Sequence, residues 1–258
     1  MILLHELGGI GLFLGQIWRT FWRTDGNFRP IIAQMASVSL RSLSTVIFAG
    51  AFVGAILVLQ FNLMLQKYDA QLLLGGLNTS ACIREVGPLI ISFLLAGKVG
   101  AFTAAELGTM RVTEQIDAIE CLGTDSMQYL ILPRFIAIVL SSLILLVIGL
   151  MVSLGGAMLV AQLACGVNPL QYISSIPRFT GLYTFAAGAF KCVVYGTIVA
   201  AVACYKGYTA SGGARGVGRA VTQAAVYTNF YIVVANFLTS YFLDFGMYLW
   251  RSWSGGVG

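Results

Sequence analysis

Three ionisable side chains stand inside long apolar stretches, where a charge is costly. They are Lys98, Lys191 and Asp244. A charged side chain at the centre of a membrane costs about 2.5–3.5 kcal/mol on insertion scales, and such residues line substrate pathways, relay protons or pair with one another. We therefore treat all three as candidates for binding or for coupling.

The remaining motifs do not support nucleotide, metal or covalent chemistry. Residues 211–219 are rich in glycine but lack the GK followed by Ser or Thr that a Walker loop needs, and no strand precedes them. This segment is predicted to be a flexible basic turn near anionic lipid headgroups. The five cysteines show no CxxC spacing, and the single histidine is His5. We expect buried cysteines, and no catalytic residue, metal site or cofactor in this chain.

The composition indicates a membrane protein. Charged residues make up 10% of the 258 residues, hydrophobic residues make up 58%, and the mean hydropathy is +0.86. Soluble domains carry about 25% charged residues. The composition therefore argues against a soluble enzyme, a disordered chain and a nucleic-acid-binding domain, although the net charge is +5.

The candidate charges must be positioned by helices that cross the membrane. A crossing helix needs about 20 apolar residues, and the alternation typical of a membrane barrel is absent. We predict an all-α membrane protein with a single domain over residues 1–258 and a five-helix bundle over 38–249. Its predicted spans are residues 38–65, 86–105, 135–160, 183–203 and 224–249. Gly50 and Gly54, followed by Ala55, form a GxxxG pattern that favours close helix packing within one chain or between two.

Residues 1–30 are predicted to form an interfacial helix and its connection to the bundle. No Lys or Arg precedes the apolar part, which is the wrong order for a secretory signal. A packed segment of the bundle is the alternative to a helix in the interface. Residues 28–30 (Phe-Arg-Pro) are expected to break the chain before the first span. The apolar face is predicted from Ile10, Phe13, Leu14, Ile17 and Phe21, and the polar face from Gln16, Arg19, Thr20 and Arg23.

The distribution of basic residues predicts the orientation. Nine lie in the N-terminal segment and in the loops after the second and fourth spans, and four lie on the other side. Because basic residues are enriched on the cytoplasmic side, we expect a cytoplasmic N-terminus and a C-terminus outside. Trp250 and Trp253 would then belong to an aromatic belt on the outer side.

Residues 106–123, between the second and third spans, are predicted to form an amphipathic helix that ends at Gly123. Val112, Ile116 and Ile119 recur on one side, and Glu114, Asp117 and Glu120 recur on another. Helices that lie on membranes are rich in Lys and Arg. Four acidic residues and one Arg in this segment favour docking into a protein partner over lying on the membrane.

Three sequence blocks together resemble the MlaE/YrbE permease family. They are IREVGP at 83–88, AGKVG at 96–100 and AAELGTMRVTEQIDAIE at 104–120, and Tyr129-Leu130 and Pro133-Arg134 continue them. These permeases are membrane subunits of ABC transporters that act with MCE-domain proteins on lipids. The resemblance is dense over about residues 80–135, and the five-span layout extends it over the chain. Lys98 stands where arginine is common, and Ser126 stands where proline is common.

The resemblance implies a homodimer in the inner membrane of a Gram-negative bacterium. A cytoplasmic ATPase would carry ATP and Mg, phospholipid would move between the inner membrane and a periplasmic ring of MCE-domain proteins, and a STAS-domain protein would bind the ATPase. Such a complex maintains outer-membrane lipid asymmetry. The ATPase would dock on residues 109–122, where the candidate contacts are Arg111, Glu114, Ile116, Asp117, Ile119 and Glu120.

The resemblance also implies a lipid cavity between two copies, open to the periplasm, and a second span that begins near Leu72. Arg84 and Glu85 then join the charged candidates. Lys191 would pair with Asp244 or Glu85, or Lys191 or Arg84 would attract a phosphate headgroup, and these readings do not exclude each other. The residues of the first span at the matching cavity positions are Leu57, Met64, Leu65 and Tyr68.

The rival functions are a secondary transporter with Lys191 and Asp244 as a proton relay, an importer of sterol-like compounds, and a scaffold.

Overall fold

The computed structural model describes residues 2–23 and 29–253, and the side chains of 2–5, 7, 23 and 247–253 are outside that description. Over this part of the chain every regular element is helical, which confirms the all-α prediction. The α-helices are α1 (Ile2–Arg23), α2 (Arg29–Gln66), α3 (Leu74–Ala81), α4 (Gly87–Leu95), α5 (Ala101–Val112), α6 (Gln115–Cys121), α7 (Leu132–Cys165), α8 (Pro169–Phe179), α9 (Leu182–Tyr208) and α10 (Gly213–Trp253). A 3-10 turn, η1 (Gln71–Leu73), and three π-helical turns, η2 (Cys82–Val86), η3 (Ala96–Gly100) and η4 (Met127–Ile131), join them.

Five segments are long and apolar enough to cross a membrane, as predicted. They are Arg29–Gln66, Gln71–Val112, Met127–Cys165, Leu182–Tyr208 and Gly213–Gly246. The second span runs without interruption through η1, α3, η2, α4, η3 and α5. It begins 15 residues before the predicted start at residue 86, so the boundary predicted from hydropathy was wrong. Arg84 and Glu85 therefore lie inside a span.

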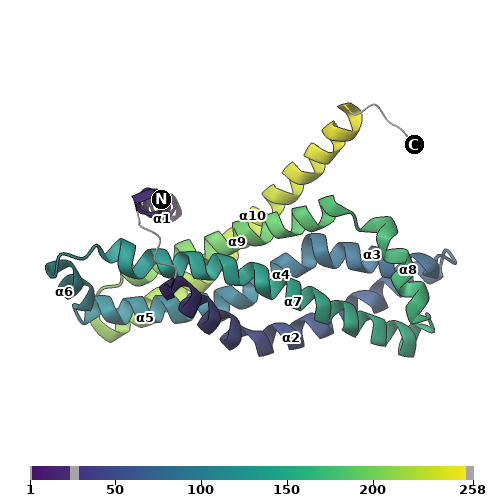
Figure 1. The fold of residues 1–258 in the computed structure, drawn as a ribbon, viewed down its shortest axis with the longest axis horizontal. Helices are drawn as coiled ribbons and strands as arrows, with labels where there is room; N and C mark the ends of the chain where they lie inside the picture. The colour runs from purple at the N-terminus through teal and green to yellow at the C-terminus, as the bar shows by residue number, and fades with distance from the viewer. Residues whose placement is uncertain (1, 24–28, 254–258) are drawn as a thin grey trace.

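The helices form an elongated bundle with two distinct ends (Figure 1). Helices α5 and α6 lie at one end, called here the α6 end, and α3 and α8 lie at the other, the α8 end. The last turns of α10 extend away from the bundle. The two ends give the molecule an axis along which the candidate residues can be placed.

Small residues bring α2 and α7 into close contact. A Cβ atom added to Gly50 would lie 2.8 Å from the carbonyl oxygen of Gly149, and one added to Gly54 would meet Ser153. The GxxxG pattern of α2 therefore packs against α7 of the same chain, since a larger side chain would force the backbones apart.

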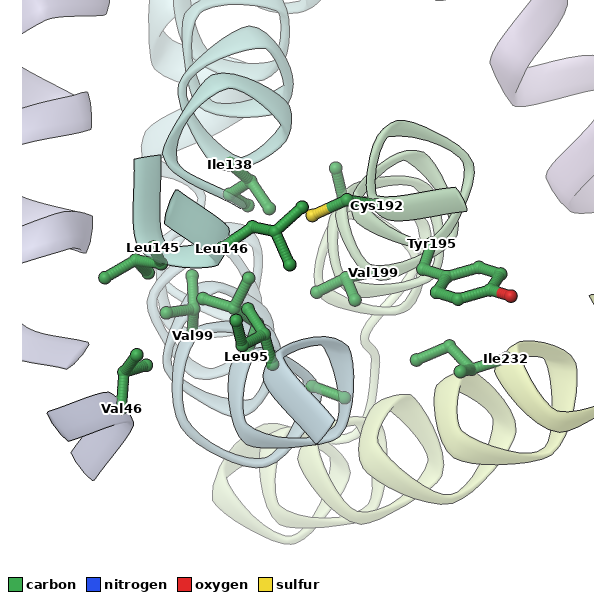
Figure 2. Close-up of a cluster of buried hydrophobic side chains, with 13 residues drawn as sticks. Val46, Leu95, Val99, Ile138, Leu145, Leu146, Cys192, Tyr195, Val199 and Ile232 are labelled. Atoms are coloured by element: carbon green, nitrogen blue, oxygen red, sulfur yellow. The ribbon is translucent and has the colours of Figure 1, made fainter. Parts of the chain in front are cut away.

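The central core is built around α9, the most buried of the five spans (Figure 2). In it, Val46 of α2, Leu95 of α4, Ile138 of α7 and Ile232 of α10 belong to one buried cluster with Val199 of α9. The spans made by α2 and α10 are the least buried. Their outward apolar faces are therefore left for lipid or for another protein chain.

Helix α1 packs one side against the bundle. Ile10, Phe13 and Ile17 are buried there, and Glu6 accepts a hydrogen bond from Lys206 of α9 at 2.5 Å. Phe21 was predicted on the same face but is 49% exposed, and it stacks with the exposed Trp18. The packed-segment alternative thus describes one side of α1, while its placement in the membrane interface stays a prediction. Phe28, part of the predicted chain break, is outside the described residues, and α2 begins at Arg29.

The predicted helix over 106–123 is two helices. Helix α5 ends at Val112, Glu114 adopts a left-handed conformation with φ of 59°, and α6 follows. A left-handed residue cannot continue a right-handed helix, so the prediction of one continuous helix was wrong. The predicted stop at Gly123 is confirmed by its φ of 81°.

The flexible turn predicted over 211–219 is also mostly wrong. Helix α9 ends at Tyr208 and α10 begins at Gly213, so residues 209–212 connect them and only 211–212 of the predicted turn lie outside a helix. The glycines that suggested a loop therefore lie largely in the first turns of a helix. The side chains of Trp250 and Trp253, which were expected in an aromatic belt, are outside the described residues.

Helix α8, which the sequence analysis did not predict, caps the bundle at the α8 end. The side chain of Asn168 accepts a hydrogen bond from the Leu170 amide at 3.0 Å, which starts the helix. The amide of Asn78 donates to the Tyr172 hydroxyl at 2.8 Å, and burial raises the pKa of Tyr172. Tyr172 therefore stays neutral and ties α8 to α3.

Candidate functional site

The π-helical turn η2 directs two consecutive charges to two different helices. Arg84 donates to Asp244 of α10, and Glu85 accepts from Lys191 of α9. A π-turn holds one residue more than an α-turn, and such turns are frequent at functional sites. The turn thus ties the second span to the fourth and to the fifth.

Lys191 is the most deeply buried charge of this group, with 1% of its side chain exposed. Its Nζ also donates to the Ser240 hydroxyl at 2.7 Å, and Ser240 donates to the second Glu85 oxygen at 3.1 Å. A buried ammonium needs such partners because leaving water costs several kcal/mol. Glu85 is 39% exposed, so the site reaches the surface on its acidic side.

The structure separates two pairings that the sequence had left open. Lys191 contacts Glu85, while Asp244 contacts Arg84. The four charges sum to zero. A headgroup phosphate would therefore bind here by displacing a carboxylate from its partner, rather than by meeting a free cation.

A second polar layer lies one helical turn away between α9 and α10. The Tyr195 hydroxyl donates to Asn236 Oδ1 at 2.7 Å and lies 3.0 Å from the Thr239 hydroxyl. In Figure 2 the Tyr195 ring carries its hydroxyl away from the apolar cluster. This layer was not predicted from the sequence. Its signal was the spacing of Asn236, Thr239 and Ser240, which places three polar residues on one face of an apolar helix.

The four cavity candidates at the α8 end do not share one environment. Met64 and Tyr68 are exposed, Leu57 is half-buried, and Leu65 is buried in a cluster with Leu74. Consecutive helical residues point about 100° apart, so Met64 and Leu65 face different ways. Met64 and Tyr68 are therefore the members of this set that can meet a ligand from outside the chain.

Lys98, the remaining charged candidate, lies apart from the η2 site. Its Nζ donates to the hydroxyl of Thr45 on α2 at 3.2 Å, and its side chain is exposed. Its position is toward the α6 end, four residues before Phe102, over whose ring Arg41 is stacked. Lys98 and the η2 charges therefore form two separate sites.

In the α6 segment, most of the candidate docking residues contact their own chain. Ile116 is completely buried and Ile119 is half-buried. Arg111 donates to Asp117 at 2.5 Å, which closes the turn between α5 and α6. Glu120 accepts hydrogen bonds from the hydroxyls of Ser126 at 2.5 Å and Tyr208 at 3.2 Å.

The surface that the α6 segment offers to a partner therefore differs from the predicted face. Glu114 is exposed at the turn before α6, and Leu122 is 83% exposed just after it. Leu122 is the last residue of the predicted docking range 109–122 but was not among its named contacts. An exposed acidic residue before α6 and an exposed leucine after it are suitable contacts for a partner protein with an apolar groove and basic residues.

These features define a multi-pass membrane protein with ion pairs between its spans. Within residues 2–23 and 29–253, no group of three or more His, Cys, Asp or Glu side chains is placed to hold a metal ion. Residues 31–242 match the family model described as Permease MlaE. The chain belongs to the MlaE family of ABC transporter permeases.

Curated relatives match most of the chain. A probable ABC transporter permease protein of Synechocystis sp. is 35% identical over 89% of this chain and 87% of its own length. One of Rickettsia bellii is 36% identical over 92% of this chain and 91% of its own. The chloroplastic protein TRIGALACTOSYLDIACYLGLYCEROL 1 of Arabidopsis thaliana is 30% identical over 90% of this chain and 67% of its own.

Proposed function

We propose that this chain moves phospholipid between the bacterial inner membrane and a periplasmic MCE-domain protein, and so maintains outer-membrane lipid asymmetry. The observation that carries the proposal is an apolar surface along α2 in a member of an ABC permease family. Phe48, Phe52, Ile56 and Leu63 are all exposed and follow one another at helical spacing toward Met64. Such a row offers a path for hydrocarbon along the length of a span.

A second copy of the chain would turn this row into one wall of a cavity. Contiguous apolar surface at this scale marks contact with a protein or a membrane, and α2 and α10 are the least buried spans. In the proposed homodimer, acyl chains would occupy the space between the copies at the α8 end. Met64 and Tyr68 would contact the acyl chains there. The paired charges of η2 would lie farther from the α8 end, along the second span.

A cytoplasmic ATPase would supply the energy and would carry ATP and Mg. We place its docking surface at the α6 end, on Glu114 and Leu122, because Ile116 faces inward. A STAS-domain protein would bind that ATPase. This placement makes the α6 end and the N-terminus cytoplasmic and the α8 end periplasmic, in agreement with the distribution of basic residues.

The rival functions are less well supported. The ion-gradient transporter required a relay between Lys191 and Asp244, but these residues pair with Glu85 and Arg84 instead. The name of the plant relative is that of a diacylglycerol lipid. Phospholipids share that two-chain backbone, and sterol-like compounds do not, so we favour phospholipid over a sterol-like substrate.

Photocrosslinking tests the cavity. A crosslinking amino acid at Met64 or Tyr68 in the reconstituted complex should capture phospholipid, and ATP should change the amount captured. Phe185 of α9, exposed but in a different span, is the control that reports bulk lipid. Equal capture at Tyr68 and Phe185, with no response to ATP, would contradict the cavity.

A charge reversal tests the docking surface. Glu114→Arg should weaken co-purification with the ATPase, since it replaces an exposed acid at the proposed contact. Asp69→Arg is the matched control, because Asp69 is an exposed acid with a similar left-handed φ of 48° at the α8 end. If both variants retain the ATPase equally, the docking surface lies elsewhere.

A further inference from the structure

A basic groove of about 610 Å³ lies near the α6 end, away from both the η2 charges and the proposed cavity. It runs between the first turns of α2, the start of α7 and the segment from η3 to α5. Its size is within the range of about 300–1,000 Å³ found for ligand sites. The groove is lined by Ala33, Gln34, Ser37, Val38, Arg41, Lys98, Val99, Phe102, Thr103, Glu106 and Arg134.

Three cations line this groove at successive levels. Lys98 reaches Thr45 of α2 at 3.2 Å, and the Arg41 guanidinium lies 4.6 Å from the ring centre of Phe102. One level further, Arg134 donates to Glu106 at 2.8 Å. The second-span residues in these three contacts, Lys98, Phe102 and Glu106, are four positions apart, which is about 6 Å along a helix that rises 1.5 Å per residue. The cations therefore form a row rather than a single point.

The positive charge of the groove is not balanced by the chain. Glu106 is the one acid in its lining, against three cations. Among the described residues, Arg41 and Lys98 form no ion pair. The Arg134 side chain is 7% exposed, and its Nε and Nη1 have no hydrogen-bond partner in the described structure. A buried guanidinium with unpaired donors is unfavourable, so an anion bound in the groove would lower the free energy of Arg134.

The walls of the groove indicate what kind of anion fits. Phe102 is exposed in the second span, and Val38 and Val99 add apolar surface beside the cations. A soluble ion would leave these side chains uncovered. A ligand with a phosphate and a hydrocarbon chain would satisfy both parts of the lining, because the guanidinium groups bind phosphate and the walls bind the chain.

We propose that this groove binds the phosphate headgroup of an anionic phospholipid from the leaflet at the α6 end. The site is separate from the cavity at Met64 and Tyr68, at the other end of α2. The proposal rests on the proposed function in that the bound lipid would be cargo or an effector of a lipid permease. Arg41 and Lys98 hold the headgroup, and Arg134 strengthens the positive field behind it.

The test uses the reconstituted permease–ATPase complex with a crosslinking amino acid at Ser37, inside the groove. In nanodiscs that contain phosphatidylglycerol and phosphatidylcholine in equal amounts, Ser37 should capture mainly phosphatidylglycerol. The double variant Arg41→Gln/Lys98→Gln should lower that capture about tenfold, because two charged contacts are lost. The double variant Arg215→Gln/Arg219→Gln removes the same charge from an exposed site on α10 and should leave capture unchanged.

Three results at Ser37 would overturn the proposal. Equal capture of the two lipids, or equal loss with both double variants, means general attraction to an anionic membrane. Loss of capture when excess inorganic phosphate is added means that the groove takes a free ion. Capture from Tyr68 is measured in the same samples. Its failure alone would refute the cavity of the proposed function and leave the groove standing.

Discussion

Lys191 is buried and its partner Glu85 is partly exposed, so removing one or the other should destabilise the protein by unequal amounts. Glu85→Gln leaves the ammonium of Lys191, 1% exposed, with only the Ser240 hydroxyl and a neutral amide as partners. Removing one partner from a buried pair costs about 3–5 kcal/mol. Lys191→Met instead leaves Glu85, which is 39% exposed and still accepts from Ser240, and we expect a cost of about 1 kcal/mol.

Thermal unfolding of the purified complex in detergent measures the difference. At about 2–4 °C per kcal/mol for a chain of this size, Glu85→Gln should lower Tm by about 6–20 °C, and Lys191→Met should lower it by a few degrees. The double variant Glu85→Gln/Lys191→Met should recover most of the loss, because it removes the unpaired buried charge. Equal effects of the two single changes, or a double variant no more stable than Glu85→Gln, would show that the unpaired charge of Lys191 is not what destabilises the protein.

Three further predictions concern the backbone. Gly156→Ala should cost about 1–3 kcal/mol, because its Cβ would lie 2.5 Å from the Ala51 carbonyl oxygen, whereas Gly155→Ala meets nothing within 4 Å and should be neutral or stabilising in a Tm measurement. Glu114→Gly should raise Tm, since it relieves about 1 kcal/mol of left-handed strain, while it weakens ATPase co-purification; a lower Tm would contradict this. Asn168→Ala should cost about 1 kcal/mol and increase hydrogen exchange in α8, and Asn168→Asp should retain the cap.

The five spans could be predicted because hydrophobicity is a local property of the chain. The start of the second span could not be predicted from the residues alone, because Asn78, Arg84 and Glu85 lower the hydropathy of its first half. Those residues are tolerated through partners on α8, α9 and α10, far away in sequence. The family resemblance placed this start correctly, whereas hydropathy did not.

The faces of the helices were harder to predict than the helices. Periodicity placed Ile116 on an apolar stripe but could not say that this stripe packs inward. The left-handed turn at Glu114 has no sequence signature, since glycine or asparagine is the usual residue there. The groove around Arg134 depends on three segments that meet only in the folded chain, so no spacing in the sequence could reveal it.

We propose that ATP hydrolysis by a partner drives phospholipid through this chain. The most direct measurement is transfer of a labelled phospholipid between proteoliposomes that contain the permease–ATPase complex and a soluble MCE-domain protein. Coupling to ATP predicts transfer that requires ATP, continues in the presence of an uncoupler, and falls with Glu114→Arg. Transfer that proceeds without ATP, or that an uncoupler abolishes, would contradict it.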